Sequence, residues 1–375
     1  MLVHHDSRPY EVAAKEASAA AKAKLQTMFN EALENARATY KTVMTQVPQD
    51  ALIRGSALSF ESMEGGVGVG FVRPDTKKQE VFGIHRHAMD QFASKVGIPI
   101  RYLTHLRDIM SAPDGAWARD LLTATLQEHY KRHDDRIMLR SVNGEVRGAL
   151  SASYRRMDAR PLLEAFVTAA KEFGALPIKS YALDTKTAFR MMVPTIYEPA
   201  PGEVIAFGLQ FRASDFGDAP LEVSVLIDRL WCTNLAIMET VLRKVHLGAR
   251  LDEQSFYSEK THELQMDTMV SAMHDLVRDS LGPERTTAVC DAIADASTSK
   301  IDAVAFMKQL REDGKLLKNE ADKIAERFNS PDVELLPPGN TLWRASNAIS
   351  LFAQDDGVSP ERAIELNTLA GAILA

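Results

Sequence analysis

The sequence is poor in cysteine and contains no long apolar run. Cys232 and Cys290 are its two cysteines, and neither belongs to a CxxC motif or a Cys/His cluster. This excludes a disulfide-rich scaffold and a cysteine-based zinc site, and it is typical of small buried residues in a reducing cytoplasm. Nowhere do roughly eighteen apolar residues follow one another, and residues 1–10 lack the apolar run of a secretory signal. We therefore expect a cytoplasmic protein without a membrane partner.

The sequence also lacks an excess of positive charge. It holds 51 acidic and 44 basic side chains and has a net charge of −7, which excludes a uniformly basic coat for nucleic acid. The imbalance is local, because residues 251–375 hold 22 acids against 12 bases, whereas residues 51–200 hold 21 bases against 17 acids. A basic groove is therefore compatible with the middle of the chain.

Length and composition indicate a folded protein with more than one domain. A hydrophobic share of 45% and a charged share of 25% are ordinary for a folded chain, and 375 residues exceed the usual size of a single core. We divide the chain into an N-terminal helix over 1–50, an α+β core over 51–250 and an acidic helical domain over 251–375. The core is the candidate nucleic-acid-binding domain.

The order of helix and strand signals predicts an α+β fold. Residues 11–47 are rich in strong helix formers and predict a long amphipathic helix. Asn143-Gly144 between two apolar runs is a strong hairpin signal. Together with a helix from Asp158, later strands and a further helix at 234–246, this predicts one curved antiparallel sheet with helices on one face. The expected strands lie at 56–60, 67–72, 80–84, 136–142, 145–154, 179–183, 187–193, 204–212 and 221–230.

Helices are expected in the remaining segments. Three precede the hairpin, at 88–96, 102–110 and 117–130, and six follow the sheet. The six lie at 259–280, 283–296, 300–312, 317–328, 340–354 and 359–373.

No motif predicts catalysis, a metal or a cofactor. The run Gly65–Gly70 alternates Gly with Val, but no Gly-Lys-Ser/Thr follows, so a strand is favoured over a phosphate loop. His129 and His133 have the spacing of metal ligands on a helix, but Lys131 and Arg132 lie between them and disfavour a cation. We therefore expect no metal, no cofactor and no enzymatic activity, although an undescribed active site stays open.

Cations beside aromatic residues in the middle of the chain are typical of single-strand binding. Such proteins hold phosphates with Lys or Arg and stack bases on aromatic rings. Here Tyr154 and Tyr181 are the stacking candidates, and the alternative is that these are ordinary solvated side chains. The candidate nucleic-acid-binding residues are Lys131, Arg132, Tyr154, Arg155, Arg156, Arg160, Lys179, Tyr181, Lys186 and Arg190.

Three runs carry a resemblance to a known family. They are Gly148-Ala-Leu-Ser-Ala-Ser-Tyr-Arg-Arg-Met157, Gly208-Leu-Gln-Phe-Arg-Ala-Ser-Asp215 and Asp228-Arg-Leu-Trp-Cys-Thr-Asn234. They are similar to segments of the phage- and plasmid-encoded "domain of unknown function 932" family, over roughly residues 80–250. This resemblance implies a mobile-element origin and supplies no catalytic residues. The element order also resembles phage single-strand annealing proteins of the RecT, Red-beta and Erf group, which implies a ring or filament.

The leading hypothesis is therefore a phage- or plasmid-type protein that binds single-stranded DNA, promotes strand annealing and recombination, and forms a homo-oligomer. The alternative is a mobile-element interaction protein, an inhibitor or adaptor of a host or phage protein, that acts through its acidic helical region.

Overall fold

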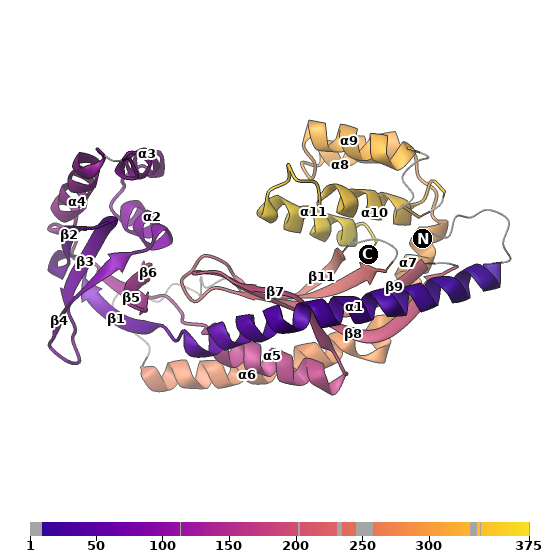
Figure 1. Cartoon of the computed structure of the whole chain (residues 1–375), viewed down its shortest axis with the longest axis horizontal. Helices are drawn as coiled ribbons and strands as arrows, with labels where there is room; N and C mark the ends of the chain where they lie inside the picture. Colours follow the sequence, from indigo (N-terminus) through magenta and orange to yellow (C-terminus); the bar gives the residue numbers. More distant parts are fainter. Residues whose placement is uncertain are drawn as a thin grey trace.

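Two β-sheets lie side by side in the computed structural model and define two lobes (Figure 1). The structure describes residues 10–112, 114–201, 203–230, 235–244, 258–330, 336–337 and 339–374. None of the helices in these ranges is both long and apolar enough to cross a membrane.

The first sheet has six strands in the order β1-β5-β6-β4-β3-β2, and among its neighbouring pairs β4 and β6 alone run parallel. Three helices, α2 (Arg86–Lys95), α3 (Ile100–Met110) and α4 (Ala116–Tyr130), pack on it around Phe92 and Leu122. A short 3₁₀ turn, η1 (Gly55–Ala57), joins β1 to β2. The strands are β1 (Gln49–Arg54), β2 (Ser59–Met63), β3 (Gly66–Val72), β4 (Gln79–Ile84), β5 (Arg136–Val142) and β6 (Glu145–Ser151).

The second sheet has five antiparallel strands in the order β11-β10-β9-β8-β7. α5 (Ala159–Glu172) and α6 (Glu259–Leu281) pack on one face, against residues such as Phe211 and Val223. The long helix α1 (Tyr10–Thr45) packs along the edge strand β7 (Figure 1). The strands are β7 (Leu176–Ala182), β8 (Thr187–Ala200), β9 (Glu203–Ala213), β10 (Leu221–Arg229) and β11 (Leu235–Lys244).

The C-terminal helices form a core of their own and dock on the second sheet through Trp343. Its indole donates to the Glu203 carboxylate (3.0 Å), which also binds Arg229 in a buried ion pair. The carboxylate charge is buried, and the indole N–H and the guanidinium supply the hydrogen bonds and the opposite charge that it needs. The helices are α7 (Pro283–Thr298), α8 (Ala303–Glu312), α9 (Lys318–Asn329), α10 (Leu342–Phe352) and α11 (Pro360–Ala372).

The predicted fold class is confirmed: an α+β chain with a long N-terminal helix and an all-helical C-terminal region. Three parts of the prediction are wrong. The hairpin does not join the later strands in one sheet, because β5 pairs with β1 and β6 with β4. Residues 234–246, predicted as a helix, contain strand β11, because β10 offers a free edge and pairing overrides a helix propensity that is only a weak prior. In place of the strand expected at 56–60, the turn η1 ends at Ala57 and strand β2 begins at Ser59.

Candidate nucleic-acid interface

The ten candidate residues lie in three places: the junction between the sheets, the end of the first sheet beside α4, and one face of the second sheet. The junction holds Tyr154, Arg155, Arg156, Arg160 and Lys186; the end of the first sheet holds Lys131 and Arg132; the second sheet holds Lys179, Tyr181 and Arg190.

A buried arginine organises the junction. Arg140 on β5 is 1% exposed, and it donates from Nε to Asp50 (2.8 Å) and from Nη2 to Asp158 (2.5 Å). Its Nη1 reaches the main-chain oxygen of Asp215 (2.7 Å), on the loop between β9 and β10. Burial raises the pKa of the Asp215 carboxyl to about 6, although Arg140 acts in the opposite direction. The guanidinium thus links β1, the start of α5 and the second sheet.

The candidates around Tyr154 belong to this structural network. Tyr154 packs in a small core with Met138 and Leu150, and burial raises the pKa of its phenol. Arg156 donates to the second oxygen of Asp50 (3.0 Å). A buried ring presents no face to a base, so Tyr154 cannot serve as a stacking residue. Arg155 is half-buried, and Arg160 is exposed on the first turn of α5.

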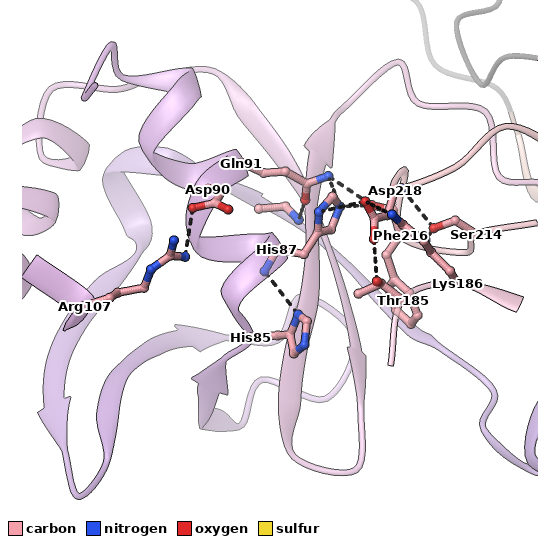
Figure 2. Close-up of polar contacts among 11 residues, drawn as sticks. His85, His87, Asp90, Gln91, Arg107, Thr185, Lys186, Ser214, Phe216 and Asp218 are labelled. Carbon is pink, nitrogen blue, oxygen red and sulfur yellow. Dashed lines mark hydrogen bonds and ion pairs between the residues drawn. The ribbon is translucent and has the colours of Figure 1, made fainter. Parts of the chain in front are cut away.

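A second polar network at the junction holds Lys186 (Figure 2). Asp218 accepts from the Thr185 hydroxyl (2.6 Å) and lies 3.4 Å from the Lys186 ammonium. His87, near the start of α2, places Nδ1 3.6 Å from the same carboxylate. Lys186 is thereby engaged with the β9–β10 loop.

Gln91, one turn after His87, ties the two sheets together through their backbones (Figure 2). Its amide nitrogen donates to the Phe216 carbonyl (3.0 Å), and its amide oxygen accepts from the Ala149 N–H (2.7 Å). Ala149 lies in the run that begins at Gly148, and Asp215 ends the run that begins at Gly208. Two of the three motif runs thus meet at this junction.

Lys131 and Arg132 follow α4 at the end of the first sheet, and both are exposed. Each lies beside Glu128, with Lys131 hydrogen-bonded and Arg132 at 3.9 Å. Two further cations lie at this end, because Arg54 closes β1 directly opposite Arg136 at the start of β5. The sequence reading missed Arg54; the signal that could have found it is a single cation at the end of a short strand.

The face of the second sheet opposite α5 and α6 gathers Tyr181 and Arg190. Tyr181 on β7 pairs with Ala188 on β8, which in turn pairs with Arg212 on β9. Arg190 lies two residues after Ala188 and therefore on the same face. Burial lowers the pKa of the Arg190 guanidinium, the Tyr181 phenol acts in the opposite direction, and the Arg212 charge adds to the lowering. By the register of β7, β8 and β9, all three side chains lie on this face.

Gln210 and Arg212 complete this face, and the sequence reading missed both. Gln210 pairs with Arg190 across the strands and accepts from its Nε (2.6 Å). The signal was the alternation along β9, where polar Gln210 and Arg212 alternate with buried Leu209 and Phe211. We call Tyr181, Arg190, Gln210 and Arg212 the arginine strip. Lys179, exposed, lies two residues before Tyr181 on β7.

Within the part of the chain that the structure describes, no three His, Cys, Asp or Glu side chains are grouped to hold a metal ion. Comparisons of the chain with protein-family models, with curated proteins and with solved structures found no match to any of them.

Proposed function

We propose that the protein binds single-stranded DNA through the arginine strip and promotes strand annealing. The observation that carries the proposal is the grouping of an aromatic ring with two guanidinium groups on one sheet face. Tyr181 and Arg190 were both candidates from the sequence, and Arg212 joins them across β8 and β9.

The strip has more hydrogen-bond donors than acceptors. The Gln210 amide oxygen is used by Arg190, and its buried amide nitrogen has no partner among the described residues. In the same described part of the chain, Glu222 is the carboxylate that approaches Arg212, at 3.8 Å. An anionic group bound beside the strip would offset the repulsion between the two guanidiniums. A backbone phosphate is such a group.

The strip also offers a surface for a base. Tyr181 is half-buried, with the small Ala188 between it and Arg212. Stacking of a base on an aromatic ring contributes about 1–3 kcal/mol and does not depend on sequence. Cations that hold phosphates and a ring that stacks on a base bind a DNA strand without recognising its base sequence. This is the property that annealing requires, and Lys179 extends the track along β7.

The proposal includes the mobile-element origin implied by the family resemblance, a homo-oligomer, and the remaining exposed cations Lys131, Arg132 and Arg160 as additional phosphate contacts. These three residues lie outside the arginine strip, so a DNA strand that contacts all of them runs across both sheets or across neighbouring subunits.

Fluorescence anisotropy with a labelled oligothymidylate over a salt series tests the proposal. Wild-type protein should bind at low salt, with a log–log slope near −0.7 per neutralised phosphate. The double variant R190Q/R212Q should bind at least tenfold more weakly and reduce the slope by about 1.4. R311Q, which removes a half-exposed arginine on α8, is the matched control and should bind as the wild type does.

Absence of binding by the wild type at low salt contradicts the proposal. If R190Q/R212Q keeps the native circular dichroism spectrum and the wild-type affinity, DNA binds elsewhere and the strip is not the interface. In the first case the alternative, a protein partner bound by the acidic helical region, becomes the leading hypothesis.

A further inference from the structure

The outer edge of strand β1 has no partner strand in the described part of the chain. β1 is the last strand of the first sheet and pairs with β5 on its inner side. At the end of this pair, the Gly55 N–H donates to the Asp135 carbonyl at 2.9 Å. Because the residues of an antiparallel strand alternate between bonding inward and outward, the residues whose backbone groups face outward are Asp50, Leu52 and Arg54.

The outward backbone groups of β1 are open to another chain. Among the described residues, the N–H groups of Asp50, Leu52 and Arg54 and the carbonyls of Asp50 and Leu52 have no hydrogen-bond partner. Helix α1 packs along the edge strand β7 and helix α4 packs beside the edge strand β2, whereas a hollow of about 530 Å³ lies beside β1. Pro74 and Asp75, in the turn between β3 and β4, line this hollow together with β1. An exposed strand edge of this kind is a template on which another strand can pair.

The sequence of β1 is complementary to itself in the antiparallel direction. Pairing β1 with β1 of a second copy about a two-fold axis at Leu52 places Leu52 opposite Leu52 and Asp50 opposite Arg54. Of the antiparallel registers that bring outward groups together, this one engages all three residues of each copy. Opposite charges that face each other directly on neighbouring strands stabilise a sheet. A second copy of this chain is therefore a matching partner for the edge.

The charged side chains of β1 favour this pairing. Arg54 is exposed, and among the described residues no carboxylate lies within 4.0 Å of its guanidinium. Asp50 binds Arg140 at 2.8 Å and Arg156 at 3.0 Å, and its side chain keeps 22% of its surface exposed. A carboxylate accepts about four hydrogen bonds, so Asp50 can also bind an arginine of the second copy.

Leu52 adds an apolar contact at the two-fold axis. It is half-buried and packs against the small core of Met138, Leu150 and Tyr154. When two copies pair, each leucine covers the surface that the other leaves exposed, and the two small cores become continuous. Burial of this apolar surface favours association.

We infer that two copies of the chain pair through β1 and join their first sheets into one continuous sheet. The contact is isologous, since the same strand contributes from both copies. It identifies the surface of the homo-oligomer that the proposed function includes, and DNA takes no part in it. The paired edge is short, so the expected dissociation constant is in the micromolar range.

Sedimentation velocity without DNA, from micromolar to submillimolar protein, tests the interface. The wild type should dimerise, and R54P should raise the dissociation constant at least tenfold. Arg54 has a φ of −70°, which proline adopts, and its N–H does not bond to β5, so the substitution removes the outward donor and the charge while β1 stays paired. R101Q, which removes an exposed arginine on α3, should dimerise within twofold of the wild type.

Cross-linking at the two-fold axis provides a second measurement that does not depend on R54P. Directly opposed residues of a hydrogen-bonded pair have Cα atoms about 5.5 Å apart, within the range of a disulfide. L52C treated with diamide should therefore form a covalent dimer on a non-reducing gel. L121C, at an exposed position on α4, is the matched control, and the wild type with its own two cysteines gives the background.

A wild type that stays monomeric overturns the inference and leaves the edge of β1 to an extended segment of a different protein. The inference is equally wrong if R54P dimerises as the wild type does, or if L52C cross-links no faster than L121C. If R54P loses the native circular dichroism spectrum, the cross-linking result alone decides. Because neither measurement contains DNA, failure of the dimer and failure of DNA binding by the arginine strip are told apart.

Discussion

Asp228, on β10, is 3% exposed, and its Oδ1 has no hydrogen-bond partner among the described residues. Burial raises the pKa of this carboxyl from 3.8 to about 7, although Lys24 on α1 acts in the opposite direction. Burial of a charged group without a full set of hydrogen bonds costs free energy, so the neutral acid fits the site better than the carboxylate.

We predict that D228N flattens the dependence of stability on pH. Because the folded pKa lies above the unfolded value, the stabilisation by the protonated carboxyl is complete below about pH 4 and is lost as the pH rises through about 7. A shift of about three units limits this loss to about 4 kcal/mol. Denaturant unfolding at pH 5.5 and 8.5 should show a decline in the wild type and a smaller one in D228N.

D322N, at an exposed position on α9, is the control for this prediction and should decline with pH as the wild type does. An equal decline in D228N and the wild type would mean that the Asp228 carboxyl gains a partner in solution. Arg140 shows the opposite case, since its buried charge is satisfied by Asp50, Asp158 and the Asp215 carbonyl; removing this charge would leave Asp158 without this partner and Asp50 paired with Arg156.

At the scale of elements, local signals predicted most helices and the hairpin, and pairing partners decided the rest. Asn143 and Gly144 both have positive φ in the turn between β5 and β6, which is why this dipeptide is so informative. Residues 235–244 combine helix formers with branched residues, so their strand depends on the neighbouring edge of β10. The sheet that a strand joins also depends on residues far away in the chain. The short strand β1 was not predicted, because its six residues give little periodicity.

Helix α4 protects the edge strand β2 through a side chain. The Gln127 amide oxygen accepts from the Phe60 N–H at 2.8 Å, and its nitrogen reaches the Leu58 carbonyl at 3.5 Å. An edge strand otherwise presents unpaired backbone groups on which another chain can pair. The glutamine side chain thus makes the backbone hydrogen bonds that a further strand of the sheet would make.

We predict that Q127M destabilises the first sheet by about 1–3 kcal/mol, the cost of leaving a half-buried N–H without a partner. Methionine keeps the length of the side chain and removes both polar groups. Hydrogen exchange measured on peptides that contain Phe60 should be faster in Q127M. Q309M on α8, where the glutamine is exposed, should leave that exchange unchanged; equal exchange in both variants would refute the capping role.

At the scale of the molecule, the candidate site was only partly predictable. The sequence placed cations beside aromatics, and Tyr181 and Arg190 do lie on one sheet face. The sequence could not show that Tyr154 is buried, because the run that contains Tyr154 also forms the contact between the two sheets. Arg212 and Arg54 become visible only when strand registers are known, since each is paired with a residue far away in the chain.

The contact between the sheets includes hydrogen bonds from a few side chains, so one substitution should loosen it. Gln91 donates to the Phe216 carbonyl and accepts from the Ala149 N–H, and Q91M removes both contacts while keeping the length of the side chain. We expect a loss of about 1–3 kcal/mol in the free energy of unfolding, from the unpaired buried N–H. Hydrogen exchange should become faster in peptides that cover 85–91 and 214–218 together, because both sides of the junction open in one motion.

Exchange in the helical region, for example over 342–352, should stay unchanged. Faster exchange on one side alone would show that the two lobes are held together mainly by Arg140, and that Gln91 orders only its own helix.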